Sequence, residues 1–519
     1  MAEGRPAVGL LTGAHAPHLE DRVTEVLNRW PSAGLAVAVV RDGRLAWFHG
    51  HGVANVSSRR PVTQDTVFRV GSITKTFTAV AVLQLWERGL VDLDAPAEDY
   101  LCSVRLTPAH EDFPPVTVRH LLTHTAGIGY WLRLPDLLRP RARSGVRAGR
   151  SVPSVPEMYR RGVPVEVEPG TKWTYTNHGF AVLGQLVEDV TGQPLDHYLR
   201  EHVFGPLGME HTDLGRSARV RPHLATGYVL RSRGLRPVAD REVPALGAGA
   251  ACSTAADLTR YATALLHGGA AGRGPVLAPT TTAAMFQPHF QPDPRVPGMG
   301  LGFLLGREGD RRTVGHDGIV PGFLSQLLLA PDDGVGVVVL ANTGGLDGRG
   351  APEPLGVALV RRLLGLPDEA VRSDVPAHPE TWHEVCGWYG PAPGPVTNLF
   401  TRAFLGAGAE VTVHGGHLVL EPLNPVPALR HGLRLHPDDP HDPRVFRVDL
   451  SGLGKSTQRV VFGGGAGTGT APTLLLDGMV LTKRADLSNP RRWSSALLAA
   501  GGVALAARGV VRRTAPRRA

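Results

Sequence analysis

The stretch RVGSITKTFTAVAVLQLWERGL, residues 69–90, decides what fold this chain is expected to have. Gly71 interrupts an extended run, and apolar residues then continue at spacings of three and four, which predicts a long helix beginning at Ser72. The stretch holds the only Ser-x-x-Lys of the chain, and a helix brings Lys75 onto the same face as Ser72. A hydroxyl at the first turn of a helix also gains from the helix dipole.

Lysine is rare in this sequence, because only four lysines stand among its 55 lysine and arginine residues. An arginine keeps its proton near neutral pH, whereas a lysine loses it when it is buried or lies beside another cation. Lys75 therefore has the chemistry of a group that takes up and releases a proton. Because a serine hydroxyl needs such a base before it attacks, Ser72 and Lys75 together indicate nucleophilic catalysis.

A second motif, Tyr175-Thr176-Asn177, is expected in a loop just before a helix. Tyr175, as a phenolate held by Lys75, can pass the serine proton to a leaving group. Asn177 can hold Lys75 with its amide oxygen and a substrate amide with its NH2 group. Lys75 can itself be the base or can lower the pKa of Tyr175, and the sequence leaves this choice open.

A third motif, His316-Asp317-Gly318, is expected at the start of a strand. Gly318 lets a substrate lie along the strand edge, and the backbone amides of Ser72 and Ile319 are candidates for an oxyanion hole. Histidine is mostly neutral at pH 7, so the motif favours an ester, a neutral amide or a free amine over a carboxylate. Asp317 either belongs to this substrate site or pairs with His316 and faces away from the pocket.

The segments around the motifs indicate an α+β fold. A helix near residues 17–29 precedes a hairpin that turns at Asp42 and Gly43, and strands followed by a helix close the region after the third motif. Strands at both ends predict one antiparallel sheet flanked by helices, with a helical subdomain between. Short alternating strands between Trp382 and Arg484 predict a smaller all-β sandwich or barrel. The expected parts are an N-terminal tail (1–16), a catalytic domain (17–367), a linker (368–381), the all-β domain (382–486) and an apolar, basic tail (487–519).

Composition excludes several classes of protein. The net charge of +8 is spread along the 519 residues without interleaved aromatics, so no nucleic-acid partner is expected. Cys102, Cys252 and Cys386 are too far apart for a disulfide framework or a metal cluster, and no metal or cofactor is expected.

The first 22 residues lack an export pattern, which favours a cytoplasmic location. The apolar run at 496–507 is shorter than the roughly 20 residues that cross a bilayer. A helix lying on a membrane surface is an alternative for this segment, but a frayed tail is the expectation.

Other motifs carry less weight. The sequence has no G-x-S-x-G elbow and no H-E-x-x-H zinc motif. DLSGLGKST, residues 449–457, approaches a phosphate loop, but Asp449 replaces its first glycine and a strand follows where a helix is required. His124, in LLTHTAG, has no second ligand at helical spacing and is interpreted as structural. The insertion at 130–162 is expected to overhang the pocket, with a solvated mobile loop as the alternative.

With these motifs in place, the chain resembles the serine β-lactamase and penicillin-binding-protein superfamily, in the class C-like branch that includes D,D-peptidases, D-aminopeptidases and family VIII esterases. The resemblance spans about residues 17–365 and includes the segments VTVRHLLTHTAGI, FGPLGMEHT and PGFLSQLLLAPDDGVGVVVLAN. It implies that Ser72 is acylated, that Lys75 and Tyr175 form the general-base pair, and that Asn177 binds a substrate amide. His316 to Gly318 then stand where β-lactamases have Lys-Thr-Gly.

The resemblance implies a serine hydrolase that acts on a small-molecule or peptide substrate. Because His316 and Asp317 replace a lysine and a hydroxyl, we expect an esterase or a D-amino-acid-specific peptidase or amidase with weak β-lactamase activity at most. Two alternatives stay open. One is an acyltransferase that uses the same acyl-enzyme, and the other is a non-catalytic protein that binds peptides or peptidoglycan.

Overall fold

The structure is a computed structural model whose contacts divide the chain into two compact units. It describes residues 16–129, 145–147, 150–271, 274–345, 347–391, 408–423, 429, 431–464, 471–476 and 478–491. The first unit comprises Met1–Val371, Gly394–Leu399 and Asp449–Gln458, and the second comprises Arg372–Pro393, Phe400–Val448 and Arg459–Ala519. Most of the two expected tails, and residues 130–144 and 148–149 of the insertion, lie outside the described residues.

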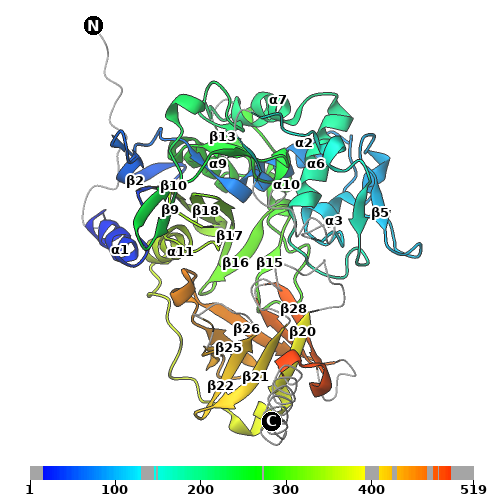
Figure 1. Ribbon diagram of the computed structural model, residues 1–519, viewed down its shortest axis with the longest axis vertical. Helices are drawn as coiled ribbons and strands as arrows, with labels where there is room; N and C mark the ends of the chain where they lie inside the picture. Colours follow the sequence, from blue (N-terminus) through cyan, green and yellow to red (C-terminus); the bar gives the residue numbers. More distant parts are fainter. Residues whose placement is uncertain are drawn as a thin grey trace, which may run out of the picture. The chain divides into compact units, whose positions relative to one another are not determined.

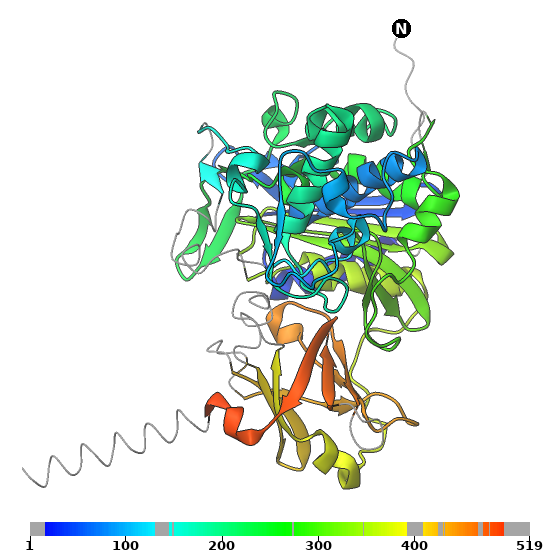
Figure 2. The same cartoon turned by 90° about the vertical axis from the view of Figure 1, so that its right-hand side faces the viewer.

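An eight-stranded sheet forms the centre of the first unit (Figures 1 and 2). Its strands are antiparallel, and β1 pairs with β2 on one side and with β19 on the other, so the two ends of the region meet in mid-sheet. This confirms the antiparallel sheet that the sequence predicted. In spatial order the strands are β15 (Gly298–Met299), β16 (Leu304–Glu308), β17 (Arg311–Val320), β18 (Phe323–Ala330), β19 (Val335–Ala341), β1 (Gly34–Arg41), β2 (Arg44–Asn55) and β3 (Arg60–Pro61).

The central strand β1 is buried on both faces, and its side chains alternate between two cores. Leu35, Val37 and Val39 pack in a cluster with helices α1 (Ala16–Arg29) and α11 (Pro352–Leu363). Ala36 and Ala38 belong to a larger cluster that includes α2 (Thr74–Glu87) and α9 (Ala255–Leu266). Because successive strand residues point to opposite faces, one apolar strand serves both cores.

The remaining elements of the first unit form the helical subdomain and its small sheets. The other helices are α3 (Val118–Leu122), α5 (Val155–Met158), α6 (Asn177–Thr191), α7 (Leu195–Leu199), α8 (Leu246–Gly249) and α10 (Pro279–Met285). A three-stranded sheet has the order β4 (Phe68–Arg69), β12 (Ala251–Ser253) and β8 (Asp213–Leu214). The paired short strands are β9 (Tyr228–Arg231) with β10 (Gly234–Pro237), β6 (Val146–Arg147) with β11 (Arg241–Glu242), β13 (Ala270–Ala271) with β14 (Gly274–Pro275), and β5 (Leu106–Pro108) with β7 (Val163–Val165).

Two boundaries differ from those predicted. The helix expected from Ser72 begins with a 3-10 turn, η1 (Gly71–Ile73), before α2. The third motif lies in the second half of β17 and not at its start, because the chain turns at Gly309 and pairs with β16 from Arg311 onward. The hairpin turn at Asp42 and Gly43 has positive φ at both residues, as its Asp-Gly sequence predicts.

The second unit is an antiparallel nine-stranded sheet, which confirms the predicted all-β domain (Figure 1). Its outer strands, β23 and β24, are separated in the chain by Leu435 alone, so the sheet is a nearly closed barrel. Tyr389, Phe446 and Phe462 pack ring against ring in its core. The strands, in spatial order, are β23 (Leu433–Arg434), β22 (His417–Pro422), β21 (Ala409–His414), β20 (Gly387–Pro391), β28 (Met479–Arg484), β27 (Thr473–Leu476), β26 (Gln458–Gly463), β25 (Val445–Val448) and β24 (His436–Pro437), and the helix α12 (Trp382–Val385) precedes β20.

Two kinds of feature are missing from the part of the chain that the structure describes. None of its helices combines the length and the apolar character needed to cross a membrane. No three of its histidine, cysteine, aspartate or glutamate side chains are grouped so that they could hold a metal ion.

Candidate active site

Ser72 lies in η1, where two glycines allow two backbones to come very close. Gly71 has a φ of 51°, a conformation that glycine adopts without strain, and a Cβ there would lie 2.8 Å from the amide nitrogen of Ile319. A Cβ on Gly318 would overlap the carbonyl oxygen of Val70. The two glycines therefore bring the turn that carries Ser72 against β17 at Ile319, which is the approach that the predicted pair of oxyanion amides requires.

One edge of β17 is open beside this turn. On that edge the pairing with β16 ends at Gly315, whereas the other edge stays paired with β18 as far as Val320. Within the described residues, the edge from His316 to Val320 thus has no strand partner. An extended substrate can lie along this edge, as the sequence predicted from Gly318.

Lys75 is fully buried, and its ammonium nitrogen contacts three oxygens. Nζ lies 3.0 Å from Ser72 Oγ, 2.7 Å from Asn177 Oδ1 and 2.7 Å from the carbonyl oxygen of Ala248. Burial holds the pKa of Lys75 well below its ordinary value, because the charged form loses its hydration. A neutral amine has two hydrogens and one lone pair. Because the Asn177 and Ala248 oxygens only accept, they take the two hydrogens, and the lone pair faces the Ser72 hydroxyl.

The loop of the second motif is fixed by the start of α6. Thr176 caps this helix, since its hydroxyl accepts a hydrogen bond from the amide of His178 and donates one to the carbonyl oxygen of Gly129. Asn177 is therefore held at the first residue of α6, where its side chain reaches Lys75. The half-buried ring of Tyr175 lies beside the same amine, with its centre 4.9 Å from Lys75 Nζ.

His124 clamps the Tyr175 loop from the other side. Its φ of 58° is unusual for a residue with a side chain. Its carbonyl oxygen accepts from the amide of Thr174 at 2.8 Å, and its Nδ1 accepts from the amide of Thr176 at 3.3 Å. The imidazole ring lies 4.5 Å from the Tyr175 ring, centre to centre. The sequence interpreted His124 as structural, and the structure places it in contact with the second motif.

Both histidines beside Tyr175 are neutral at pH 7. Burial lowers the pKa of His124 well below its ordinary value and lowers that of His316 to about 4, because the charged imidazolium loses its hydration. His316 Nδ1 lies 2.7 Å from the carbonyl oxygen of Asp317. Since a carbonyl oxygen only accepts, Nδ1 carries the hydrogen and Nε2 keeps a lone pair. The third motif therefore presents no cation through His316.

The side chain of Asp317 does not lie on the Ser72 side of the sheet. Its cross-strand partner is Gln326, whose side chain reaches Gly356 on α11. Because residues paired across strands share a face, Asp317 points toward α11, opposite to His316. Its carboxylate lies 3.5 Å from Nζ of Lys455. The sequence allowed the interpretation that Asp317 faces away and pairs with His316. The structure agrees with the first part, but the ion pair of the Asp317 carboxylate is with Lys455.

The antiparallel sheet and the helices around it agree with the comparison with known proteins. The family model described as Beta-lactamase matches residues 20–362, which is more than half of the chain. The chain belongs to the beta-lactamase family.

Relatives within the beta-lactamase family differ in the reactions that their names describe. The chain is 36% identical to the esterase EstB of Burkholderia gladioli over 39% of its length and 52% of the relative's. It is 32% identical to a D-aminopeptidase of Gluconobacter oxydans over 42% of its length and 39% of the relative's. The chain thus spans about half or less of these two relatives. The octameric penicillin-binding protein homologue from Pyrococcus abyssi shares the fold, with a TM-score of 0.59 at 24% identity over 91% of this chain and all of that one.

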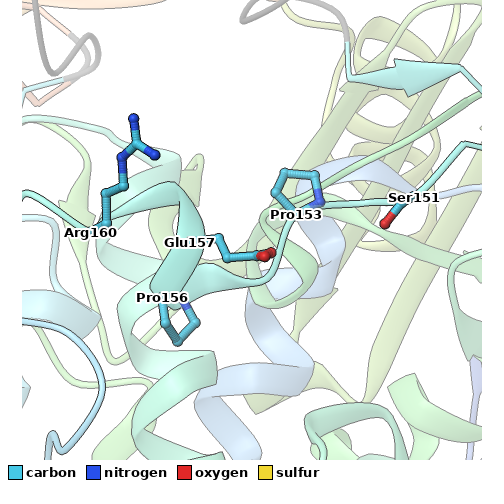
Figure 3. A pocket seen from close by; sticks show the side chains of 5 residues that line it. All are labelled: Ser151, Pro153, Pro156, Glu157 and Arg160. Carbon is cyan, nitrogen blue, oxygen red and sulfur yellow. The ribbon is translucent and has the colours of Figure 1, made fainter.

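The described part of the insertion lies beside the second motif of this family fold. Residues 151–160 line an open depression, with the side chains of Ser151, Pro153, Pro156, Glu157 and Arg160 around it (Figure 3). Tyr159 Oη and His178 Nδ1 share a hydrogen bond of 2.7 Å. This bond ties α5 to the first turn of α6, the turn that also carries Asn177.

Sequence reasoning missed three contributions to the site. The Ala248 carbonyl oxygen carries no side-chain signal and was not predictable. The left-handed backbone of His124 was equally hidden, although its place in a Thr-His-Thr run before Ala126 and Gly127 marked a turn. Lys455 had a usable signal, because the scarcity of lysine that singled out Lys75 applies to it as well.

Proposed function

We propose that the protein is a serine hydrolase that cleaves esters or amides through an acyl-enzyme on Ser72. The observation that carries this proposal is the fully buried Lys75, whose amine has two acceptor-only partners and one reactive hydroxyl as its neighbours. Membership of a family with an esterase and a D-aminopeptidase among the relatives supports it. In this proposal the Ser-x-x-Lys at 72–75 is the catalytic motif, and Tyr175 is the second member of the general-base pair.

The proposed reaction begins when the Ser72 hydroxyl gives its proton to Lys75 and its oxygen attacks the substrate carbonyl carbon. The amides of Ser72 and Ile319 stabilise the negative charge that develops on the carbonyl oxygen. The bond to the leaving group then breaks, and the leaving group takes the proton through Tyr175, which lies beside the Lys75 amine. Water attacks the ester of Ser72 in the same way, which releases the acid and restores the enzyme.

The proposed substrates are esters, neutral amides or D-amino-acid derivatives, with weak β-lactamase activity at most. His316 is neutral at pH 7 and its Nε2 keeps a lone pair, so it accepts a hydrogen bond and offers no charge to a carboxylate. A substrate NH or ammonium group can donate to this acceptor, and the NH2 group of Asn177 can donate to the carbonyl oxygen of a substrate amide. Rates measured side by side with esters and with D-amino-acid amides distinguish an esterase from a D-amino-acid-specific amidase.

The test combines a covalent probe with a substrate panel. A fluorophosphonate probe followed by peptide mass spectrometry should label Ser72, and the label should vanish in Lys75→Ala. The same preparation is then assayed with p-nitrophenyl acetate and butyrate, D-amino-acid amides and a cephalosporin. Absence of any label and of any turnover would favour the alternative of a non-catalytic peptide-binding protein. Faster hydrolysis of the cephalosporin than of the esters would contradict the proposed substrate class, and transfer products with an added alcohol would favour an acyltransferase.

Other expectations from the sequence stay proposals. We retain the domain boundaries at 17–367 and 382–486, a small-molecule or peptide substrate, no nucleic-acid partner and a cytoplasmic location. Cell fractionation with an antibody against the protein tests the location directly.

A further inference from the structure

The segment Asp449–Gln458, here called the latch, belongs to the first unit although the strands before and after it, β25 and β26, belong largely to the second. It is the stretch whose sequence approaches a phosphate loop. Its centre is the 3-10 turn η8 (Ser451–Leu453), closed by Gly454 in a left-handed conformation with a φ of 67°. Lys455 follows at once, and it is one of only four lysines in the chain.

The latch is held on the first unit by bonds to carboxylates. Ser456 donates to Glu353 through its backbone amide, at 3.0 and 3.1 Å to the two oxygens, and through its hydroxyl at 2.5 Å. Thr457 donates to Glu369 through its amide at 3.0 Å and its hydroxyl at 2.6 Å. The amides and hydroxyls that a phosphate loop would offer to phosphate are thus given to the protein's own acids.

Close packing adds to these bonds. Arg29 donates to the hydroxyl of Ser451 at 3.2 Å. A Cβ on Gly454 would lie 3.1 Å from the amide nitrogen of Gly350 and 3.2 Å from the Trp30 ring, so only glycine fits without displacing its neighbours. The backbone just before Lys455 is therefore fixed on the first unit.

Lys455 lies among acidic groups on the α11 side of the sheet. Its Nζ is 3.5 Å from Asp317 Oδ2, and Glu353, at the first turn of α11, interacts with both residues. Without the lysine, two carboxylates would face each other in a partly buried place, which is unfavourable because like charges repel strongly away from bulk water. Lys455 thus offsets this repulsion and holds the Asp317 carboxylate where it is.

Asp317 connects this cluster to the substrate side of β17. Its side chain meets Lys455 on one face, and its carbonyl oxygen accepts the hydrogen of His316 Nδ1, which fixes the tautomer and the orientation of that ring. Ile319, a candidate oxyanion donor, is two residues further along the same strand. A shift of Asp317 therefore also shifts the ring of His316 and the amide of Ile319.

We propose that the latch sets the third motif from behind the sheet, and that Lys455 is a positioning residue that acts through Asp317 on His316 and Ile319. Lys455 touches no reacting atom in this role. The latch, whose sequence approaches a phosphate loop, binds the protein's own carboxylates and is not a nucleotide site. This inference rests on the proposed hydrolase activity for its kinetic readout only.

The test is a double-variant cycle in the full-length protein. Lys455→Met should lower kcat/KM for p-nitrophenyl acetate by about tenfold, mainly through kcat, because residues in contact couple by amounts of that order. Asp317→Asn removes the charge that needs the lysine, so the double variant K455M/D317N should return to within about threefold of D317N alone.

Lys455→Arg should keep most of the activity, because it keeps the cation. Lys483→Met is the matched control, since Lys483 donates to the carbonyl oxygen of Glu384 in the second unit, and it should leave kcat/KM unchanged.

Two outcomes would overturn the proposal: an unchanged kcat/KM in K455M, or the same loss from K455M whether residue 317 is Asp or Asn. Hydrogen exchange of the peptide covering residues 311–320 gives a readout that needs no activity, and it should speed up in K455M but not in K483M. If the wild-type protein hydrolyses nothing in the panel, the proposed function fails, and the exchange result still decides for or against the latch. If K455M does not fold, the comparison of K455R and K455M/D317N with D317N decides.

Discussion

Replacing Lys75 with methionine tests the centre of the proposed mechanism with the least change of shape. Methionine keeps an unbranched, apolar side chain in the buried space and removes only the amine that contacts Ser72, Asn177 and Ala248. A general base contributes about 10²- to 10⁴-fold to a rate, so kcat should fall by that factor, which corresponds to about 3–5 kcal/mol of transition-state stabilisation. KM should change little, because Lys75 is buried behind Ser72 and has no proposed contact with the substrate.

The same substitution has two opposing effects on stability. It leaves the Asn177 Oδ1 and Ala248 carbonyl acceptors without a donor, at a cost of about 1–3 kcal/mol each. It also removes an amine whose charged form is disfavoured by burial. Because the pKa of Lys75 is lower in the folded state, the unfolded state binds more protons between the folded and the unfolded pKa, and wild-type stability rises with pH over that range. The stability of K75M relative to wild type should therefore be highest at low pH and fall as the pH rises.

The assay measures kcat and KM with p-nitrophenyl acetate and the melting temperature from pH 6 to pH 10, for wild type, K75M and the control K483M. K483M should match wild type in rate. A K75M enzyme that keeps more than about a tenth of the wild-type kcat while remaining folded would refute the role of Lys75 as base. Tyr175 would then be the base that needs no amine.

Two further predictions follow from the same geometry. The kcat/KM of wild type should fall as the pH is lowered, because protonation of Lys75 removes the lone pair that faces Ser72; a rate that rises toward acid pH would show that the amine is not the proton acceptor. His124→Asn should lower kcat by about tenfold, because it removes the ring that packs on Tyr175 and the Nδ1 that accepts from the amide of Thr176. It should cost little stability, because asparagine tolerates the left-handed backbone. Measuring kcat and the melting temperature together separates the two effects.

The sequence was sufficient for the features that depend on local pattern. The helix after Gly71 and the turn at Asp42 and Gly43 follow from glycine placement and apolar spacing, and the structure has them. The meeting of β1 with β19 followed from strands at both ends of the region and the need to pair them. The contact between Lys75 and Ser72 followed from one helical turn.

The features that were not predictable depend on long-range contacts. The side of β17 that each motif residue faces was fixed only by its pairing with β18, which turned Asp317 toward α11. The partners of Lys455 come from residues 317 and 353, more than a hundred positions earlier in the chain, and no local spacing encodes them. The contacts of His124 with the Tyr175 loop were likewise not predictable, because they are made by its backbone and ring together.

The position of β1 in mid-sheet also sets the order of events at the ribosome. Ala38 pairs with Val338, so this strand has no partner on that edge until 300 further residues have been made. At roughly 5–20 residues per second, the nascent chain carries β1 with this edge unpaired for about 15–60 s. Synthesis in the presence of holdase chaperones should therefore raise the yield of native protein, whereas slowing translation between these two strands should favour aggregates.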